Sequence, residues 1–109
     1  MVRGMPQPPS LTPEQRVQAL AKAAEARRVR AELKEKLKMG ALTLPALLAQ
    51  AEHDDHVGKM KVLAVIEALP GVGKVKARRT MEEIGIADTR RVRGLGEQQR
   101  SKLLEAFGQ

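Results

Sequence analysis

Two glycines and a lysine in the segment LPGVGK, residues 69–74, could bind a phosphate group. The glycines permit a tight turn and leave no Cβ between the backbone and an approaching anion, whereas Val72 can anchor the turn in the core. If a helix begins directly after the turn, its first amides lack partners within the helix, and the helix dipole favours an anion beside them. This pattern is typical of a helix-hairpin-helix, which recognises phosphate and carries no information on base identity.

Basic residues follow the turn and would add positive charge beside these amides. The chain has no Trp, no Tyr and only Phe107, so it offers no aromatic platform on which unpaired bases could stack. The expected partner is therefore double-stranded DNA, bound through its phosphate backbone. The predicted contacts of this segment are Pro70, Gly71, Val72, Gly73, Lys74, Lys76 and Arg78.

The turn has two other interpretations. A kinase-type phosphate loop needs a glycine five residues before its Gly-Lys pair and a Ser or Thr after it, but these positions hold Ala68 and Val75. Nucleotide hydrolysis of that type is thus not expected. Alternatively, the glycines make a tight turn between two helices and bind nothing.

A second copy of the turn argues against the interpretation that the glycines bind nothing. Residues 94–97, GLGE, repeat residues 71–74 at an offset of 23 residues. We predict two hairpin units, near residues 69–85 and 92–108, that each hold duplex backbone. Because Glu97 begins the second helix, the first unit should bind phosphate better. The second turn adds the predicted contacts Gly94 and Gly96.

Three arginines surround one apolar residue in the segment DTRRVR, residues 88–93. Val92 can point inward while Arg90, Arg91 and Arg93 stay exposed for bidentate phosphate contacts or insertion into a minor groove. The alternative is a solvated run of charge. Because the segment lies between two predicted hairpin units, we favour contact of its arginines with DNA.

The groups that contact phosphate must be positioned by helices, of which the first is the most clearly marked. Thr12 as N-cap, Pro13 at the first helical position and Gln15 as capping-box partner predict its start. Good helix formers continue to Met39, and Gly40 ends them. The resulting helix of about 27 residues is about 40 Å long.

The first half of this helix is rich in alanine, and Leu20 is its only large apolar side chain between Gln18 and Arg28. We expect it to project from the core, whereas the second half docks through residues repeated every four positions. These are Val29, Leu33 and Leu37. The projecting surface is either a solvated helix or a second contact with DNA. That contact would use Arg27, Arg28 and Arg30.

Further helices are predicted in the rest of the chain. Thr43 can cap a short helix with Pro45 in its first turn, and a break follows near residues 53–56. From Val57 the apolar spacing predicts a central core helix that ends at Pro70. No segment alternates as a half-buried strand does, so the expected fold is all-α.

Composition and charge restrict the remaining function classes. The 109 residues carry a formal net charge of +7 and no cysteine, which favours a polyanionic partner and excludes disulfides and cysteine-containing zinc sites. The cluster His53, Asp54, Asp55 and His56 is better explained by helix capping than by a metal site. We predict no catalytic site, metal or cofactor, no membrane span, and a cytoplasmic location.

The expected organisation is a disordered arm at residues 1–11, a long basic helix at 12–40 and a helical DNA-binding domain at 41–109. The sequence also contains a specific set of segments: 11–16, 26–34, 58–62, 67–76 and 89–96. With these segments the chain resembles the actinobacterial, mycobacterial-type integration host factors, which are nucleoid-associated proteins of the helix-two-turns-helix kind. The resemblance is weakest at residues 41–56, and the N-terminal arm is longer than usual.

The resemblance implies an all-helical, non-enzymatic protein that binds duplex DNA with little sequence preference, bends it and compacts the chromosome in the nucleoid. It also implies a host role in phage integration, with a phage integrase as a partner on DNA, and we expect a monomer in solution. Two alternatives stay open. An RNA-binding ribosomal-type protein could use a similar turn and a long basic helix, although the missing aromatics argue against it. A hairpin module from a repair enzyme is less favoured, since the caps at the start and the C-terminus suit a freestanding protein.

Overall fold

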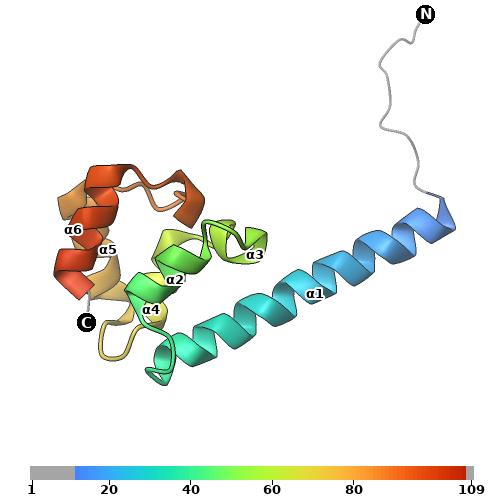
Figure 1. Ribbon diagram of the computed structural model, residues 1–109, viewed down its shortest axis with the longest axis horizontal. Coiled ribbons are helices and arrows are strands. Elements are labelled where there is room, and N and C mark those ends of the chain that lie inside the picture. The colour runs from blue at the N-terminus through green and yellow to red at the C-terminus, as the bar shows by residue number, and fades with distance from the viewer. Residues whose placement is uncertain (1–11, 108–109) are drawn as a thin grey trace, which may run out of the picture.

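The computed structural model describes residues 12–107, and every regular element in that range is helical apart from one isolated β-bridge (Figure 1). The predicted all-α fold is confirmed. The predicted arm at residues 1–11 and the end of the second hairpin unit, residue 108, lie outside the described residues. The elements are α1 Pro13–Lys38, α2 Leu44–Gln50, α3 Asp55–Gly58, α4 Val62–Ala68, α5 Gly73–Ile84, the 3-10 helix η1 Val92–Gly94, and α6 Glu97–Phe107.

Helix α1 begins at the predicted capping box. The Thr12 Oγ1 accepts a hydrogen bond of 3.1 Å from the Gln15 amide, and the Gln15 side chain accepts one of 3.0 Å from the Thr12 amide. Both hydrogen bonds satisfy amides that a helix start leaves without partners. At the other end Gly40 has a φ of 77°, a left-handed conformation that suits glycine and ends the helix.

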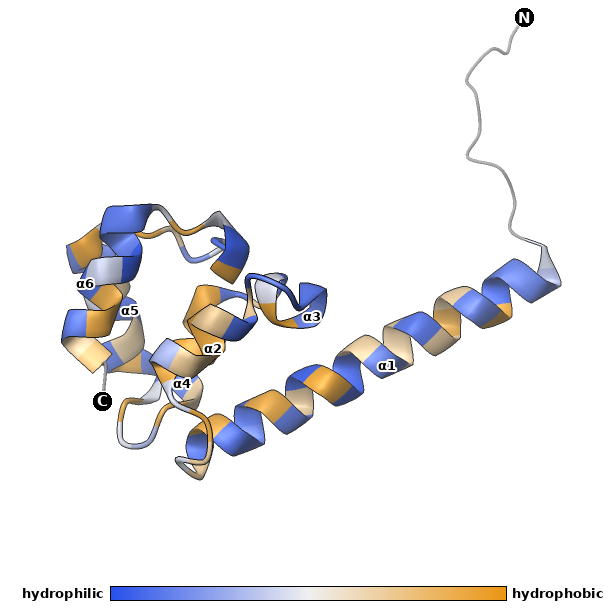
Figure 2. Cartoon of the chain, in the orientation of Figure 1, coloured by the Kyte–Doolittle hydropathy of each residue, from blue (hydrophilic) through white to orange (hydrophobic). Residues whose placement is uncertain are grey.

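The N-terminal half of α1 extends away from the other helices, as the sequence predicts (Figure 1). Leu20 is 64% exposed, and the buried residues of the helix, Leu33 and Leu37, both lie in its C-terminal half. Hydrophilic residues interrupt the helix on every turn, so its outer half offers little apolar surface to bury (Figure 2). Its helical state there depends on propensity and caps rather than on packing.

One hydrophobic core holds the remaining helices together. It combines Leu37 of α1, Leu47 of α2, Ile66 of α4, Met81 of α5 and Leu103 of α6, all inaccessible to solvent. Helix α5 packs against both α4 and α6, while α1 packs against α3 and α4. No polar or charged side chain within residues 12–107 is buried, so the charged groups of the described chain all reach the surface.

The central helix predicted from Val57 to Pro70 is wrong in one respect: two helices occupy this range. Helix α3 ends at Gly58, and α4 begins only at Val62. Between them the chain pairs with the arginine segment through an antiparallel bridge of Lys61 with Arg91. The Val62 amide donates to the Arg90 carbonyl at 2.9 Å, and the Val92 amide donates to the Met60 carbonyl at 2.8 Å. Met60 keeps the three-residue spacing of a helix from Val57, which is why periodicity alone did not reveal the break.

Candidate nucleic-acid interface

The turn between α4 and α5 has the backbone that a hairpin requires. Leu69 ends α4 in an extended conformation, and Gly71 and Gly73 have φ angles of 74° and 73°. A Cβ added at either glycine would meet no atom within 4 Å, so space within the protein does not demand glycine. The left-handed backbone does, because L side chains rarely adopt it.

The first turn of α5 is open to an anion. Its N-cap residue, Val72, provides no side-chain hydrogen bond, and the turn contains no acidic residue. Val72 itself packs partly buried against the core, as the sequence predicts. The amides of the first helical turn therefore keep their donors, and the helix dipole adds partial positive charge beside them.

Most residues predicted to contact phosphate at this turn are exposed. The two glycines of the turn share this accessibility with the basic side chains that follow on α5. The exposed members of the set are Pro70, Gly71, Gly73, Lys74, Lys76 and Arg78. Because no ion pair among the described residues involves Lys74, Lys76 or Arg78, their charges are available to a ligand.

The second glycine turn has a different backbone from the first. Gly94 ends η1 and Leu95 is extended, but neither Gly94 nor Gly96 has a positive φ. The Gly96 amide donates a 2.9 Å hydrogen bond to the Gln99 side chain, and Glu97 occupies the first turn of α6. Similar sequences thus form two different turns, and only the first leaves its helix start uncapped and without an acid.

The arginines of segment 88–93 are partly engaged within the protein. Arg90 donates to the Gly94 carbonyl and Arg91 donates to the Lys59 carbonyl, both at 2.6 Å. Between the arginines Val92 is buried, as predicted. A guanidinium has five N–H donors, so each of these arginines retains donors for a further acceptor.

Arg93 has the largest structural role of the three. Its guanidinium pairs with the Asp55 carboxylate at 2.9 Å and donates to the Ala51 carbonyl at 3.2 Å. Gly58 lies beneath it, because a Cβ there would fall 2.8 Å from the Arg93 Nε. No role was predicted for Gly58. A glycine inside an apolar helical pattern was the available indication of a close approach.

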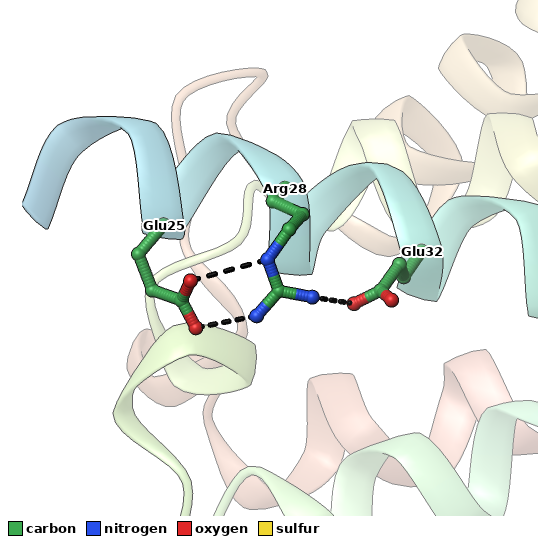
Figure 3. Close-up of polar contacts among 3 residues, drawn as sticks. All are labelled: Glu25, Arg28 and Glu32. Atoms are coloured by element: carbon green, nitrogen blue, oxygen red, sulfur yellow. Dashed lines mark hydrogen bonds and ion pairs between the residues drawn. The ribbon is translucent and has the colours of Figure 1, made fainter. Parts of the chain in front are cut away.

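Arg28 of α1 is compensated by two carboxylates (Figure 3). It pairs with Glu25 at 2.6 Å and with Glu32 at 2.8 Å on the exposed surface of the helix. The hydrogen bond with Arg28 lowers the pKa of Glu25, and the same contact raises the pKa of Arg28. Arg27 and Arg30 take no part in an ion pair with any described residue, so the three arginines predicted as a second contact are not equivalent.

The cluster of residues 53–56 is organised as a helix cap. The Asp54 carboxylate accepts a hydrogen bond of 3.0 Å from the His56 amide at the start of α3 and one of 3.2 Å from the Gln50 side chain. The hydrogen bond from Gln50 is the main cause of a lowered pKa at Asp54. In the described part of the chain, no three His, Asp or Glu side chains gather into a group that could hold a metal ion.

No helix within residues 12–107 has the length and apolar character needed to cross a membrane.

Residues 37–107 match the model of the S13-like H2TH domain family. This range contains the α4–α5 turn, the arginine segment and the last two residues of α1.

Two relatives and one solved structure illustrate the relationship over a longer range. The chain is 61% identical over 100 residues to the integration host factor of Mycobacterium tuberculosis, covering 92% of this chain and 95% of that one. It is 54% identical to the integration host factor of Streptomyces coelicolor, covering 92% and 94%. A solved structure of sIHF bound to an 8 bp palindromic DNA is similar with a TM-score of 0.78 and 51% identity, covering 81% of this chain and 99% of that one. The chain therefore belongs to the family of mycobacterial and Streptomyces integration host factors and carries its helix-two-turns-helix domain.

Proposed function

We propose that this protein binds double-stranded DNA through the phosphate backbone, with little sequence preference, as a non-enzymatic architectural protein of the nucleoid. The observation that carries the proposal is the α4–α5 turn. Gly71 and Gly73, both in a left-handed conformation, lead into the start of α5, which has no side-chain cap. Lys74, Lys76 and Arg78 lie close to this helix start. The relationship to a protein solved with a DNA duplex supports the same function.

In this proposal the turn binds one phosphate through backbone amides of α5, and the nearby cations bind the same or the next phosphate. Amide donors at a helix start and long basic side chains both recognise phosphate without reading base edges. The donors come from Gly73 and Lys74 onward, whereas Pro70, Gly71 and Val72 shape the approach of the backbone. Because these contacts involve phosphate only, the affinity should depend little on the DNA sequence.

The arginine segment provides a second group of contacts. Arg90, Arg91 and Arg93 each keep free N–H donors despite their internal hydrogen bonds, and these bonds hold the guanidinium groups in place before DNA arrives. Gly94 and Gly96 follow this segment and are exposed. They would let a strand approach the backbone closely, although the Gly96 amide is already bonded to Gln99.

Helix α1 provides a further contact through Arg27 and Arg30. Arg28 was predicted with them, but its charge is compensated by Glu25 and Glu32, and we leave it out of the contact surface. Contacts on separate elements are what bending a duplex requires, because the deformation energy must be recovered on both sides of the bend. Bending, compaction of the chromosome and a host role in phage integration, with an integrase on the same DNA, complete the proposal.

Binding to unrelated duplexes at several salt concentrations tests the proposal. Two labelled duplexes of different sequence should bind with similar affinity, and log affinity should fall by about 0.9 per log unit of salt for each phosphate neutralised. An affinity that does not change with salt would rule out backbone recognition. Competition with a structured RNA of equal length should leave most of the protein on DNA; preferential release by RNA would instead assign the surface to RNA.

A further inference from the structure

A small basic hollow lies where α1 faces the Lys61–Arg91 bridge. It has a volume of about 280 Å³, and two of its six lining residues, Met60 and Ala64, are apolar. The other four are cations. They are Arg30, Lys34, Lys61 and Arg91.

The fold forces these four like charges together from three segments of the chain. Arg30 and Lys34 lie one turn apart on α1, next to the docked residue Leu33. Lys61 and Arg91 are partners in the bridge, and like charges placed directly opposite in such a pair repel. None of the four cations forms an ion pair with a carboxylate within residues 12–107.

The hollow is also organised in advance. The 2.6 Å hydrogen bond from Arg91 to the Lys59 carbonyl fixes one edge of the guanidinium and leaves its remaining donors free. Met60 is buried beneath the bridge, so the apolar floor is part of the core and does not collapse. A fixed guanidinium surrounded by three flexible cations suits a compact oxyanion with several acceptor oxygens.

We propose that the basic hollow binds one phosphate group, held jointly by Arg30, Lys34, Lys61 and Arg91. The proposal rests on the DNA-binding function above and adds a specific site to it. The phosphate can come from a phosphodiester of the duplex or from a free polyphosphate, because the chemistry of recognition is the same. In either case the ligand replaces repulsion among four cations by attraction to one anion.

The position of the hollow relates it to the hairpin turn. Arg27, Arg30, Lys34 and Lys38 follow one another at spacings of three and four residues and so share a face of α1. At one end of this face Lys38 lines a shallow depression together with residues 67–73 of the turn. From Lys38 to Arg30 the helix rises about 12 Å, the length of three to four base pairs along one strand. A strand held at the turn would thus follow α1 to the hollow.

Two double variants that lose the same charge distinguish binding at the hollow from the general effect of net positive charge. Lys34→Gln with Lys61→Gln removes two of its cations, whereas Lys36→Gln with Lys102→Gln removes one exposed lysine from another face of α1 and one from α6. The first variant should bind a labelled duplex about tenfold more weakly, with a salt slope lower by about 0.9. The control variant should bind within about twofold of the wild type, because it loses no direct phosphate contact.

A second measurement identifies the source of the phosphate. Tripolyphosphate should raise the unfolding temperature of the wild type and of the control variant by more than that of the hollow variant, which keeps only the phosphate site at the hairpin turn. If the two variants differ in protection by tripolyphosphate but not in duplex affinity, the hollow binds free polyphosphate. If they differ in duplex affinity but not in protection, the hollow binds a phosphate of the duplex. Equal behaviour of the two variants in both measurements overturns the proposal. Failure of the wild type to bind any duplex would instead overturn the DNA-binding function itself.

Discussion

The guanidinium of Arg93 lies against Gly58, with its Nε only 2.8 Å from the position that a Cβ of residue 58 would occupy. This contact places η1 on α3, where Arg93 also pairs with Asp55. The same guanidinium donates to the carbonyl of Ala51 at the end of α2. The glycine therefore leaves room for the guanidinium in its present position and is not required by an unusual φ. Gly58 and Arg93 should behave as one unit in mutagenesis.

A double-mutant cycle on this pair tests their coupling. Gly58→Ala should displace the guanidinium and lose its internal hydrogen bonds, which costs about 1 kcal/mol of unfolding free energy. In an Arg93→Ala background the same change should be neutral or stabilising, because the clash is gone and alanine is the better helix former by up to about 1 kcal/mol. Urea denaturation of the four proteins measures the coupling energy. Additive effects would show that the two residues are independent.

The hairpin glycines should respond to substitution more strongly than Gly96 of the second turn. Gly73→Ala forces a side chain into a left-handed conformation and should cost about 1–2 kcal/mol of stability. Gly96→Ala is the matched control, because its φ is not positive and a Cβ there would lie 3.4 Å from Gln99. Chemical denaturation compares the two, and duplex affinity measured under folded conditions should fall for Gly73→Ala. Equal stability losses would contradict the backbone argument.

Asp54 should make stability depend on pH in the acidic range. Hydrogen bonds, first from Gln50 and then from backbone amides, lower the pKa of Asp54 in the folded protein. Its contribution is therefore complete above the unfolded pKa of about 3.9 and is lost as the pH falls through the lower folded value. Asp54→Asn should flatten the dependence of unfolding free energy on pH below about 4 relative to wild type. Parallel curves for the two proteins would exclude this role.

Arg28 and Arg30 should differ in their effect on DNA binding although they are two residues apart. Arg30→Ala removes a cation of the basic hollow and should weaken duplex binding about five- to tenfold. Arg28→Ala removes a charge that Glu25 and Glu32 already compensate, so affinity should change less than about twofold. Fluorescence anisotropy with one labelled duplex at fixed salt checks both. A larger loss from Arg28→Ala would place the contact on the opposite face of α1.

Two leucines of α1 should report on where this helix is anchored. Leu37 is inaccessible to solvent, so Leu37→Ala should cost about 2–5 kcal/mol through lost burial and an internal cavity. Leu20 is 64% exposed, and Leu20→Ala should change stability by no more than about 0.5 kcal/mol. Thermal unfolding compares the variants. A substantial loss from Leu20→Ala would mean that the outer half of the helix packs against another molecule.

Local chemistry in the sequence was sufficient to predict much of this structure. The capping box at Thr12 and the glycine at position 40 located the ends of α1, and the Gly71 and Gly73 pair located the hairpin turn. These features act within a few residues, where steric and hydrogen-bonding rules are strong. The compensation of Arg28 could also have been predicted, since Glu25 and Glu32 stand at the three- and four-residue spacings of helical ion pairs.

Contacts between distant segments were not predictable from these local rules. The break before α4 depends on Arg91, thirty positions after Lys61 in the sequence, and no pattern within residues 57–70 indicates that partner. Local similarity also misled at the second glycine turn. Its sequence resembles that of the first turn, but it follows the 3-10 helix η1, and its glycines lack the positive φ of the first pair. The basic hollow required both the bridge and the docking of α1, so its four cations were assigned separately or not at all.

The bridge between Lys61 and Arg91 also has a topological consequence. The hydrogen bonds from Val62 and Val92 tie together both ends of the chain segment that contains α4, the hairpin turn and α5. This segment is consequently a closed loop fixed at its base, and the turn at its tip is braced against the arginines at its root. If a duplex binds the tip as proposed, the packed helices α4 and α5 would transmit its force to the hydrogen-bonded base of the loop, so the DNA would deform more than the loop.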